Sequence, residues 1–180
     1  MMMALWKPGL VLVLLLFLLP LSSVSQNDTV QKEPHLLSFN LGVYNISRPE
    51  YYHGLYEMEF FPDWKLWFFY PFAGVFVNTY AKACIYAGIT IPIRVKKHFL
   101  LRLSFAPGLY TVSDEKKDLG FFLEFHSSIK LAWIFNNDSR LGFQLAHLSN
   151  AGLHEPNPGC ETLVISYEIP LVIKSSAKQK

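Results

Sequence analysis

Residues 121–150 read FFLEFHSSIKLAWIFNNDSRLGFQLAHLSN. Two runs with a two-residue period flank the turn signal Asn136-Asn137-Asp138. The first run places large apolar side chains at alternate positions, namely Phe121, Leu123, Phe125, Ile129, Leu131, Trp133 and Phe135. The second run, Arg140–Asn150, alternates in the same way. Because successive side chains of a strand point to opposite sides, this stretch predicts an antiparallel hairpin with one apolar face.

The whole chain repeats this pattern, and no stretch between Leu36 and Ile173 has a helical period. We predict eight strands, at Leu36–Ile46, Tyr51–Phe61, Lys65–Tyr80, Cys84–Val95, Phe99–Val112, Phe121–Phe135, Arg140–Asn150 and Thr162–Lys174. Strands of this length suit a tilted membrane crossing, and an even number can close without leaving a sheet edge. The predicted fold is therefore all-β, an eight-stranded antiparallel outer-membrane β-barrel. A soluble sandwich, with its apolar side inward, is the alternative.

The composition agrees with a single folded domain in contact with lipid. Hydrophobic residues make up 51% of the 180 residues and charged residues 17%, which excludes an intrinsically disordered chain. The aromatic content of 16% suits a lipid-facing surface. A net charge of +2 gives no electrostatic signature of nucleic-acid binding. The two cysteines, Cys84 and Cys160, are too few for a disulfide framework or a zinc site, and we expect two free thiols.

Residues 1–25 have the features of a cleaved secretory signal peptide. Lys7 supplies the positive charge, Leu10–Leu19 the apolar segment, and Ser23 and Ser25 the small residues before the cut. The apolar segment is shorter than the roughly 20 residues that a spanning helix needs. An uncleaved N-terminal helix is the alternative.

The mature chain, residues 26–180, is then expected to form one barrel domain. It has a short polar lead-in at its N-terminus and a basic tail, Val172–Lys180, which we interpret as a periplasmic extension, with contact to the membrane surface as the alternative. With eight strands both termini are periplasmic, so the connection between strands seven and eight lies at the outer end of the barrel.

Polar residues interrupt the apolar row of the seventh strand. His147 and Ser149 are two residues apart, so both side chains leave the same face, as a base and a serine nucleophile require. Glu161 opens the next strand with matching parity and could hold the His147 ring. Asn150 follows the serine and could donate a hydrogen bond to a developing oxyanion. A chance His-x-Ser pair is the alternative, but unpaired polar groups facing lipid are costly, which favours a functional site.

The same residues carry a resemblance to a known family. The run His147–Leu153, followed by Pro156–Gly159 and Glu161, closely resembles the lipid A 3-O-deacylase (PagL) family, also labelled acyloxyacyl hydrolases. Two further stretches look like the same family, Phe105–Tyr110 and Ser166–Leu171. The resemblance extends from about Leu66 to Leu171 and is weak before that.

This resemblance implies an eight-stranded outer-membrane barrel with a Ser-His-Glu triad on its exterior. By motif match, Ser149 is the nucleophile, His147 the general base and acid, and Glu161 the residue that orients His147. Asn150, with backbone amides near Gly152, would form the oxyanion hole. The implied reaction is hydrolysis of the ester-linked acyl chain at the 3-position of lipid A. No metal or other cofactor is implied.

The resemblance also implies the setting of the reaction. The implied partner is lipid A of lipopolysaccharide in the outer membrane of a Gram-negative cell. Independently of the resemblance, we expect a monomer and no nucleic-acid partner. The apolar rows of strands five to eight, including Phe105, Phe125 and Tyr167, could cradle an acyl chain. The chain departs from the family at His126-Ser127, where some members carry an acidic residue, so its acyl preference stays open.

Two other functional classes remain. A non-enzymatic outer-membrane barrel that binds lipid or acts as an adhesin would share the strand pattern, although the intact triad spacing argues against it. A eukaryotic secreted β-protein would explain three Asn-x-Ser/Thr sequons, at Asn27, Asn45 and Asn137, which are also common by chance.

Overall fold

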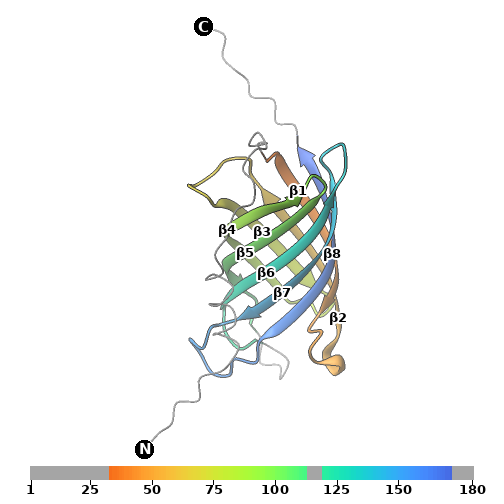
Figure 1. The fold of residues 1–180 in the computed structure, drawn as a ribbon. Helices are drawn as coiled ribbons and strands as arrows, with labels where there is room; N and C mark the ends of the chain where they lie inside the picture. Colours follow the sequence, from red (N-terminus) through yellow and green to blue (C-terminus); the bar gives the residue numbers. More distant parts are fainter. Residues whose placement is uncertain (1–32, 113–118, 172–180) are drawn as a thin grey trace, which may run out of the picture. The chain divides into compact units, whose positions relative to one another are not determined.

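The computed structural model describes residues 33–112 and 119–171. Eight antiparallel strands form a closed barrel in this part of the chain (Figure 1). They are β1 (His35–Tyr44), β2 (His53–Phe61), β3 (Tyr70–Asn78), β4 (Ala83–Lys96), β5 (Phe99–Tyr110), β6 (Leu123–Ile134), β7 (Arg140–Ser149) and β8 (Cys160–Leu171). The predicted eight-stranded antiparallel barrel is confirmed. The predicted signal peptide and basic tail lie outside the described residues.

Each strand pairs with its neighbours in sequence, and β1 pairs with β8 to close the barrel. A short 3-10 helix, η1 (Pro49–Tyr51), lies between β1 and β2. Over the residues that the structure describes, no helix has the length and apolarity needed to cross a bilayer.

The direction in which the apolar face points distinguishes a membrane barrel from a soluble sandwich. In β7, Leu141, Phe143 and Leu145 are 45%, 61% and 45% exposed on the outside of the barrel. Arg140 and Gln144, on the other face of the same strand, are buried inside it. Large apolar side chains thus cover the exterior, while the interior holds charged and amide side chains together with a cluster of buried aromatic and aliphatic ones. This is the arrangement of a barrel surrounded by lipid.

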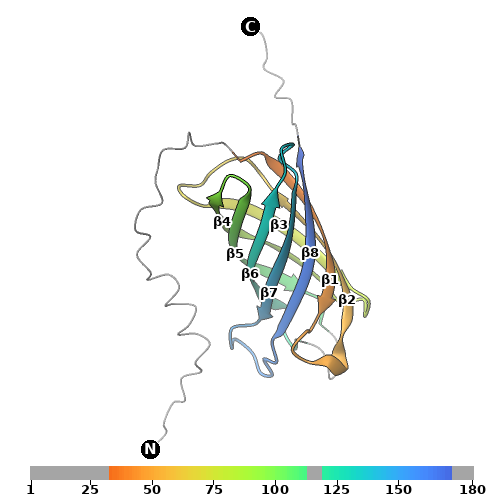
Figure 2. The same ribbon diagram turned by 45° about the vertical axis from the view of Figure 1, so that its right-hand side comes forward.

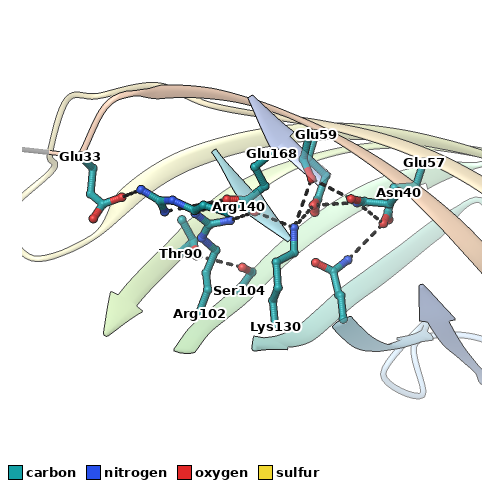
Figure 3. A network of polar contacts seen from close by, with 12 residues as sticks. Glu33, Asn40, Glu57, Glu59, Thr90, Arg102, Ser104, Lys130, Arg140 and Glu168 are labelled. Atoms are coloured by element: carbon teal, nitrogen blue, oxygen red, sulfur yellow. Dashed lines mark hydrogen bonds and ion pairs between the residues drawn. The ribbon is translucent and has the colours of Figure 1, made fainter. Parts of the chain in front are cut away.

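A network of paired charges makes the polar interior compatible with burial (Figure 3). The carboxylate of Glu168 accepts hydrogen bonds from both terminal nitrogens of Arg102, and its Oε1 lies 3.0 Å from Nζ of Lys130. Nζ of Lys130 also lies 3.0 Å from Glu59 Oε2. The amide of Asn40 donates to the carboxylates of both Glu57 and Glu59, at 2.8 and 3.0 Å. Because a buried charge is costly unless it is paired, these contacts permit a charged interior.

Glu33 extends this network just before β1 begins. Its carboxylate accepts hydrogen bonds from Arg140 and from Arg94, the latter at 3.1 Å. Burial alone would raise the pKa of Glu33, but the adjacent Arg140 guanidinium and then Arg94 bring this pKa below its ordinary value. Glu33 is therefore fixed to the barrel interior by charge.

The third strand begins later than the predicted Lys65. Residues 62–69 form a turn in which Leu66 and Phe69 exchange backbone hydrogen bonds of 2.9 and 3.1 Å. Trp67 adopts a positive φ of 61° there and reverses the chain, so β3 starts only at Tyr70. The prediction that residues 65–69 belong to a strand is wrong, because these mostly apolar residues form a turn.

Two connections that matter for function leave the barrel at the same end (Figure 2). They are the loop of residues 45–52 between β1 and β2, which contains η1, and the loop of residues 150–159 between β7 and β8. We call them the first loop and the last loop, and we call this end of the barrel the site end. The closure of β1 on β8 brings the two loops together.

Candidate active site

A histidine and a glutamate meet on the outer surface at the site end. His147 of β7 stands directly opposite Glu161 of β8 in the strand register. Nδ1 of His147 and Oε1 of Glu161 are 3.1 Å apart, and the two side chains are 49% and 37% exposed. An ion pair this exposed adds at most about 1 kcal/mol to stability. The contact with Glu161 therefore serves to orient the imidazole of His147. Nε2, the other ring nitrogen, stays available for proton transfer.

Ser149 lies one outward position further along β7. The intervening Leu148 is fully buried, so His147 and Ser149 project from the same outer face, as the alternation predicts. The register places Phe125 of β6 opposite Ser149, and Ser127 opposite His147. The serine, the histidine and the glutamate thus lie on one outer face of β7 and β8, with His147 and Glu161 in direct contact.

An aromatic surface adjoins this polar patch on the side of β6. The rings of Phe125 and Phe105 stack, with centroids 5.8 Å apart and an angle of 13° between their planes. Phe105 is exposed, and β5 and β6 carry the two rings side by side. An apolar chain that crosses this surface would end beside Ser149.

The last loop turns sharply to deliver Glu161 next to His147. Gly159 has a positive φ of 63°, and a Cβ at this position would lie 3.1 Å from Cε1 of the His147 ring. Only glycine combines this backbone conformation with this close approach at low cost. The backbone of Gly159 thus packs closely against the imidazole of His147.

Comparison with known proteins identifies the family of the chain. Residues 50–170 match the family model described as "Lipid A 3-O-deacylase (PagL)". The chain belongs to the PagL family. Two curated relatives named "Lipid A deacylase PagL" match shorter segments. The one from Bordetella bronchiseptica is 35% identical over 51 residues, which is 28% of this chain and 29% of that protein. The one from Pseudomonas aeruginosa is 38% identical over 55 residues, 31% of this chain and 32% of that protein.

The matched segments therefore span about a third of the length of these PagL relatives. Solved structures extend the likeness of fold to the whole barrel. A crystal structure of the outer membrane enzyme PagL superposes with a TM-score of 0.62 at 22% identity, covering 76% of this chain and 99% of that one. A de novo designed transmembrane β-barrel superposes with a TM-score of 0.50 at 11% identity, covering 77% and 98%.

Within this PagL-family barrel, Asn150 takes a different place from the predicted one. Its side chain is buried, and its amide nitrogen donates to the carbonyl oxygens of His154 and Pro156, at 3.0 and 3.5 Å. Its Oδ1 accepts a hydrogen bond from the Gly152 amide at 2.9 Å. The even position of Asn150 in the alternation turns it away from the face that carries Ser149. Asn150 therefore shapes the last loop from within, and the Gly152 amide is bound to it.

Tyr167 does not join the other two residues predicted to contact the acyl chain. It lies opposite Leu141 in β7 and opposite Phe39 in β1, six positions along β8 from Glu161. At about 3.3 Å per residue this places Tyr167 roughly 20 Å from the His147–Glu161 pair. Of the three predicted residues, Phe125 stands opposite Ser149, and Phe105 stacks on Phe125 from β5.

Both cysteines are free and buried, as predicted. Cys84 faces the interior from β4, and Cys160 is the first residue of β8 rather than a loop residue. In the described part of the chain, no group of three or more His, Cys, Asp and Glu side chains is placed to hold a metal ion.

Two contacts at this site were missed by the sequence analysis. Ser47 donates a hydrogen bond to Oε2 of Glu161, and Nη2 of Arg48 donates to the carbonyl oxygen of Pro158 at 2.7 Å. The residues around Ser47 carry only a turn signal. The available clue was topological, because a closed barrel places its first loop beside the start of its last strand.

Proposed function

We propose that this protein is an outer-membrane esterase that hydrolyses the ester-linked acyl chain at the 3-position of lipid A. The proposal rests on the His147–Glu161 pair beside an outward serine, Ser149, on the lipid-facing surface of a PagL-family barrel. The names of the curated relatives give the substrate, lipid A, and the reaction, deacylation. The related solved structure is that of an outer membrane enzyme, which supports the location.

In the proposed reaction, Ser149 is the nucleophile and His147 the general base. Glu161 accepts a hydrogen bond from Nδ1–H of His147, which fixes the tautomer that leaves Nε2 free to take the Ser149 hydroxyl proton. The Ser149 oxygen then attacks the ester carbonyl, the bond between the acyl carbon and the sugar oxygen breaks, and His147 gives its proton to that oxygen, which leaves as a hydroxyl while the acyl group stays on Ser149. Water hydrolyses the acyl-enzyme by the same route and releases the fatty acid. No metal or other cofactor takes part.

The oxyanion needs donors beside Ser149, and the Gly152 amide is the proposed one. In the described conformation this amide donates to Asn150 Oδ1, so an oxyanion at this position must replace Asn150 as the acceptor. We therefore assign Asn150 the role of holding the last loop, rather than that of a direct donor.

The substrate is proposed to reach Ser149 sideways, from the membrane. Lipid A would lie in the outer leaflet, level with the site end, with the acyl chain to be cleaved lying along Phe105 and Phe125. Such a site needs no opening through the barrel, whose interior is occupied by the charged network. The protein is expected to act as a monomer, because the proposed machinery comes from one chain.

The test is mass spectrometry of lipid A incubated with the purified, folded protein in detergent. The expected product has lost one 3-linked acyl chain, and Ser149→Ala is expected to lose this activity by several powers of ten while staying folded. Folding is checked by the mobility shift on heating in SDS.

Ser127→Ala provides the matched control. Ser127 is an exposed serine on the same outer face. It lies on β6, directly opposite His147 of β7, whereas Glu161 faces His147 from β8. If Ser127→Ala rather than Ser149→Ala abolishes release, the nucleophile is wrongly assigned. If the wild type binds lipid A without releasing an acyl chain, the non-enzymatic lipid-binding barrel is the better description.

A further inference from the structure

The first loop contacts the last loop and the start of β8 at three points. The backbone amide of Ile46 donates to the carbonyl oxygen of Glu161 at 2.9 Å, and Ser47 Oγ donates to the Glu161 carboxylate. The Arg48 guanidinium donates to the Pro158 carbonyl oxygen at 2.7 Å. Three successive residues thus bind the segment that presents Glu161 to His147.

The two oxygens of the Glu161 carboxylate have different partners. Oε1 faces Nδ1 of His147, whereas Oε2 accepts the hydrogen bond from Ser47. A carboxylate with a single exposed partner rotates readily, because an exposed ion pair is worth little and water competes for both oxygens. A second donor on the far oxygen stops this rotation and keeps Oε1 directed at the imidazole.

We propose that Ser47 is a positioning residue of the hydrolytic site, acting through Glu161 on the orientation of His147. This inference rests on the proposed function and adds a fourth side chain to the proposed Ser149–His147–Glu161 arrangement. The role is distinct from catalysis, because Ser47 donates to the oxygen of Glu161 that faces away from the imidazole.

The first loop is ordered enough to present Ser47 in one place. The backbone amide of Arg48 donates to the Asn45 carbonyl oxygen at 3.1 Å, and that of Tyr51 donates to the Arg48 carbonyl oxygen at 2.8 Å. Asn45 is buried and has a positive φ of 68°, which turns the chain at the end of β1. Arg48 in turn holds Pro158, the neighbour of the glycine that packs against the His147 ring. One loop therefore supports both members of the His147–Glu161 pair.

The test compares Ser47→Ala and Ser47→Thr with the wild type. Loss of one hydrogen bond to a carboxylate predicts a kcat for Ser47→Ala about tenfold lower, with KM unchanged because Ser47 does not contact the substrate. Ser47→Thr keeps the hydroxyl and is expected to restore most of the rate. In a Glu161→Ala background, Ser47→Ala is expected to cause no further loss, because its effect passes through the missing carboxylate.

Tyr52→Phe serves as the control for loop order. Tyr52 donates its hydroxyl proton to the Ile46 carbonyl oxygen at 3.2 Å, within the same loop and away from Glu161. This variant should keep the wild-type rate. A wild-type rate for Ser47→Ala overturns the proposal, and so does an equal loss in Tyr52→Phe, a change in KM alone, or an additive loss in the Glu161→Ala background.

Labelling by a fluorophosphonate, which reacts with activated serines, separates this inference from the choice of substrate. Ser47→Ala is expected to slow the labelling of Ser149 by the same factor of about ten. If wild-type Ser149 is labelled but lipid A is not cleaved, the substrate proposal fails, and the labelling rates alone decide the role of Ser47. If wild-type Ser149 is not labelled, the inference and the proposed triad both fail.

Discussion

Gly159→Ala offers the most direct test of how the last loop holds the imidazole. The added Cβ would lie 3.1 Å from Cε1 and 3.7 Å from Nε2 of His147. Carbon atoms in ordinary contact are about 3.5–4.0 Å apart, so the ring must retreat by roughly half an ångström. A misplacement of about 1 Å costs about 100-fold in rate, so half of it predicts a loss of about tenfold.

The same substitution also strains the backbone. A residue with a Cβ at φ +63° costs about 1–2 kcal/mol, which a barrel should survive. Gly152→Ala is the control for this strain, because Gly152 has φ +78° and a Cβ there would meet nothing within 4 Å. The two variants should lose similar stability in urea unfolding from detergent or lipid.

The assay is the rate of acyl-chain release from a defined lipid A, normalised to the folded fraction measured by heat-modifiability. A folded Gly159→Ala protein that works at the wild-type rate would show that contact with Gly159 does not position His147. A loss that disappears after normalisation would trace the effect to folding instead.

Three further predictions concern the site and the interior. Glu161→Gln should be nearly as slow as Glu161→Ala in one detergent, because the amide keeps the size of the side chain but loses the charge that stabilises the imidazolium; full activity of the Gln variant would make that charge irrelevant. Glu168→Ala should lower the free energy of unfolding by about 3–5 kcal/mol, since it leaves Arg102 and Lys130 buried without their shared carboxylate; unchanged urea unfolding would contradict this. Cys84 and Cys160 should react with an alkylating reagent only after unfolding, because both are buried; rapid labelling of the folded barrel, followed by mass spectrometry, would argue otherwise.

The barrel could be predicted from the sequence because each strand has one side toward lipid and one side toward a largely polar interior. This produces a strict alternation of apolar and polar residues. Every strand from β4 to β8 begins and ends within about two residues of its predicted bounds, apart from the last, which was extended beyond Leu171 into residues that are not described. The turn at residues 62–69 was missed because its apolar residues, including Trp64 and Trp67, are exposed at the end of the barrel. In a membrane protein, apolar composition by itself does not separate a strand from an interfacial turn.

The site was predictable to the extent that its contacts are local. His147 and Ser149 share a face by strand parity, and a hairpin brings Glu161 opposite His147. Parity also shows that Asn150 turns inward, which conflicts with the predicted role of its side chain as an outward-facing oxyanion donor. Ser47 joins the site across 114 positions of sequence, and only the closure of the barrel brings it there.

The pairing of β1 with β8 links the proposed activity to assembly of the barrel. The β7–β8 hairpin alone can align His147 with Glu161, but the donors from Ile46 and Ser47 arrive only when the first strand meets the last. A chain that is inserted but not yet sealed would therefore carry a nucleophile without its full support. On this view the proposed site is complete only at the last step of barrel assembly, and the rate of acyl-chain release would report the fraction of barrels that have closed.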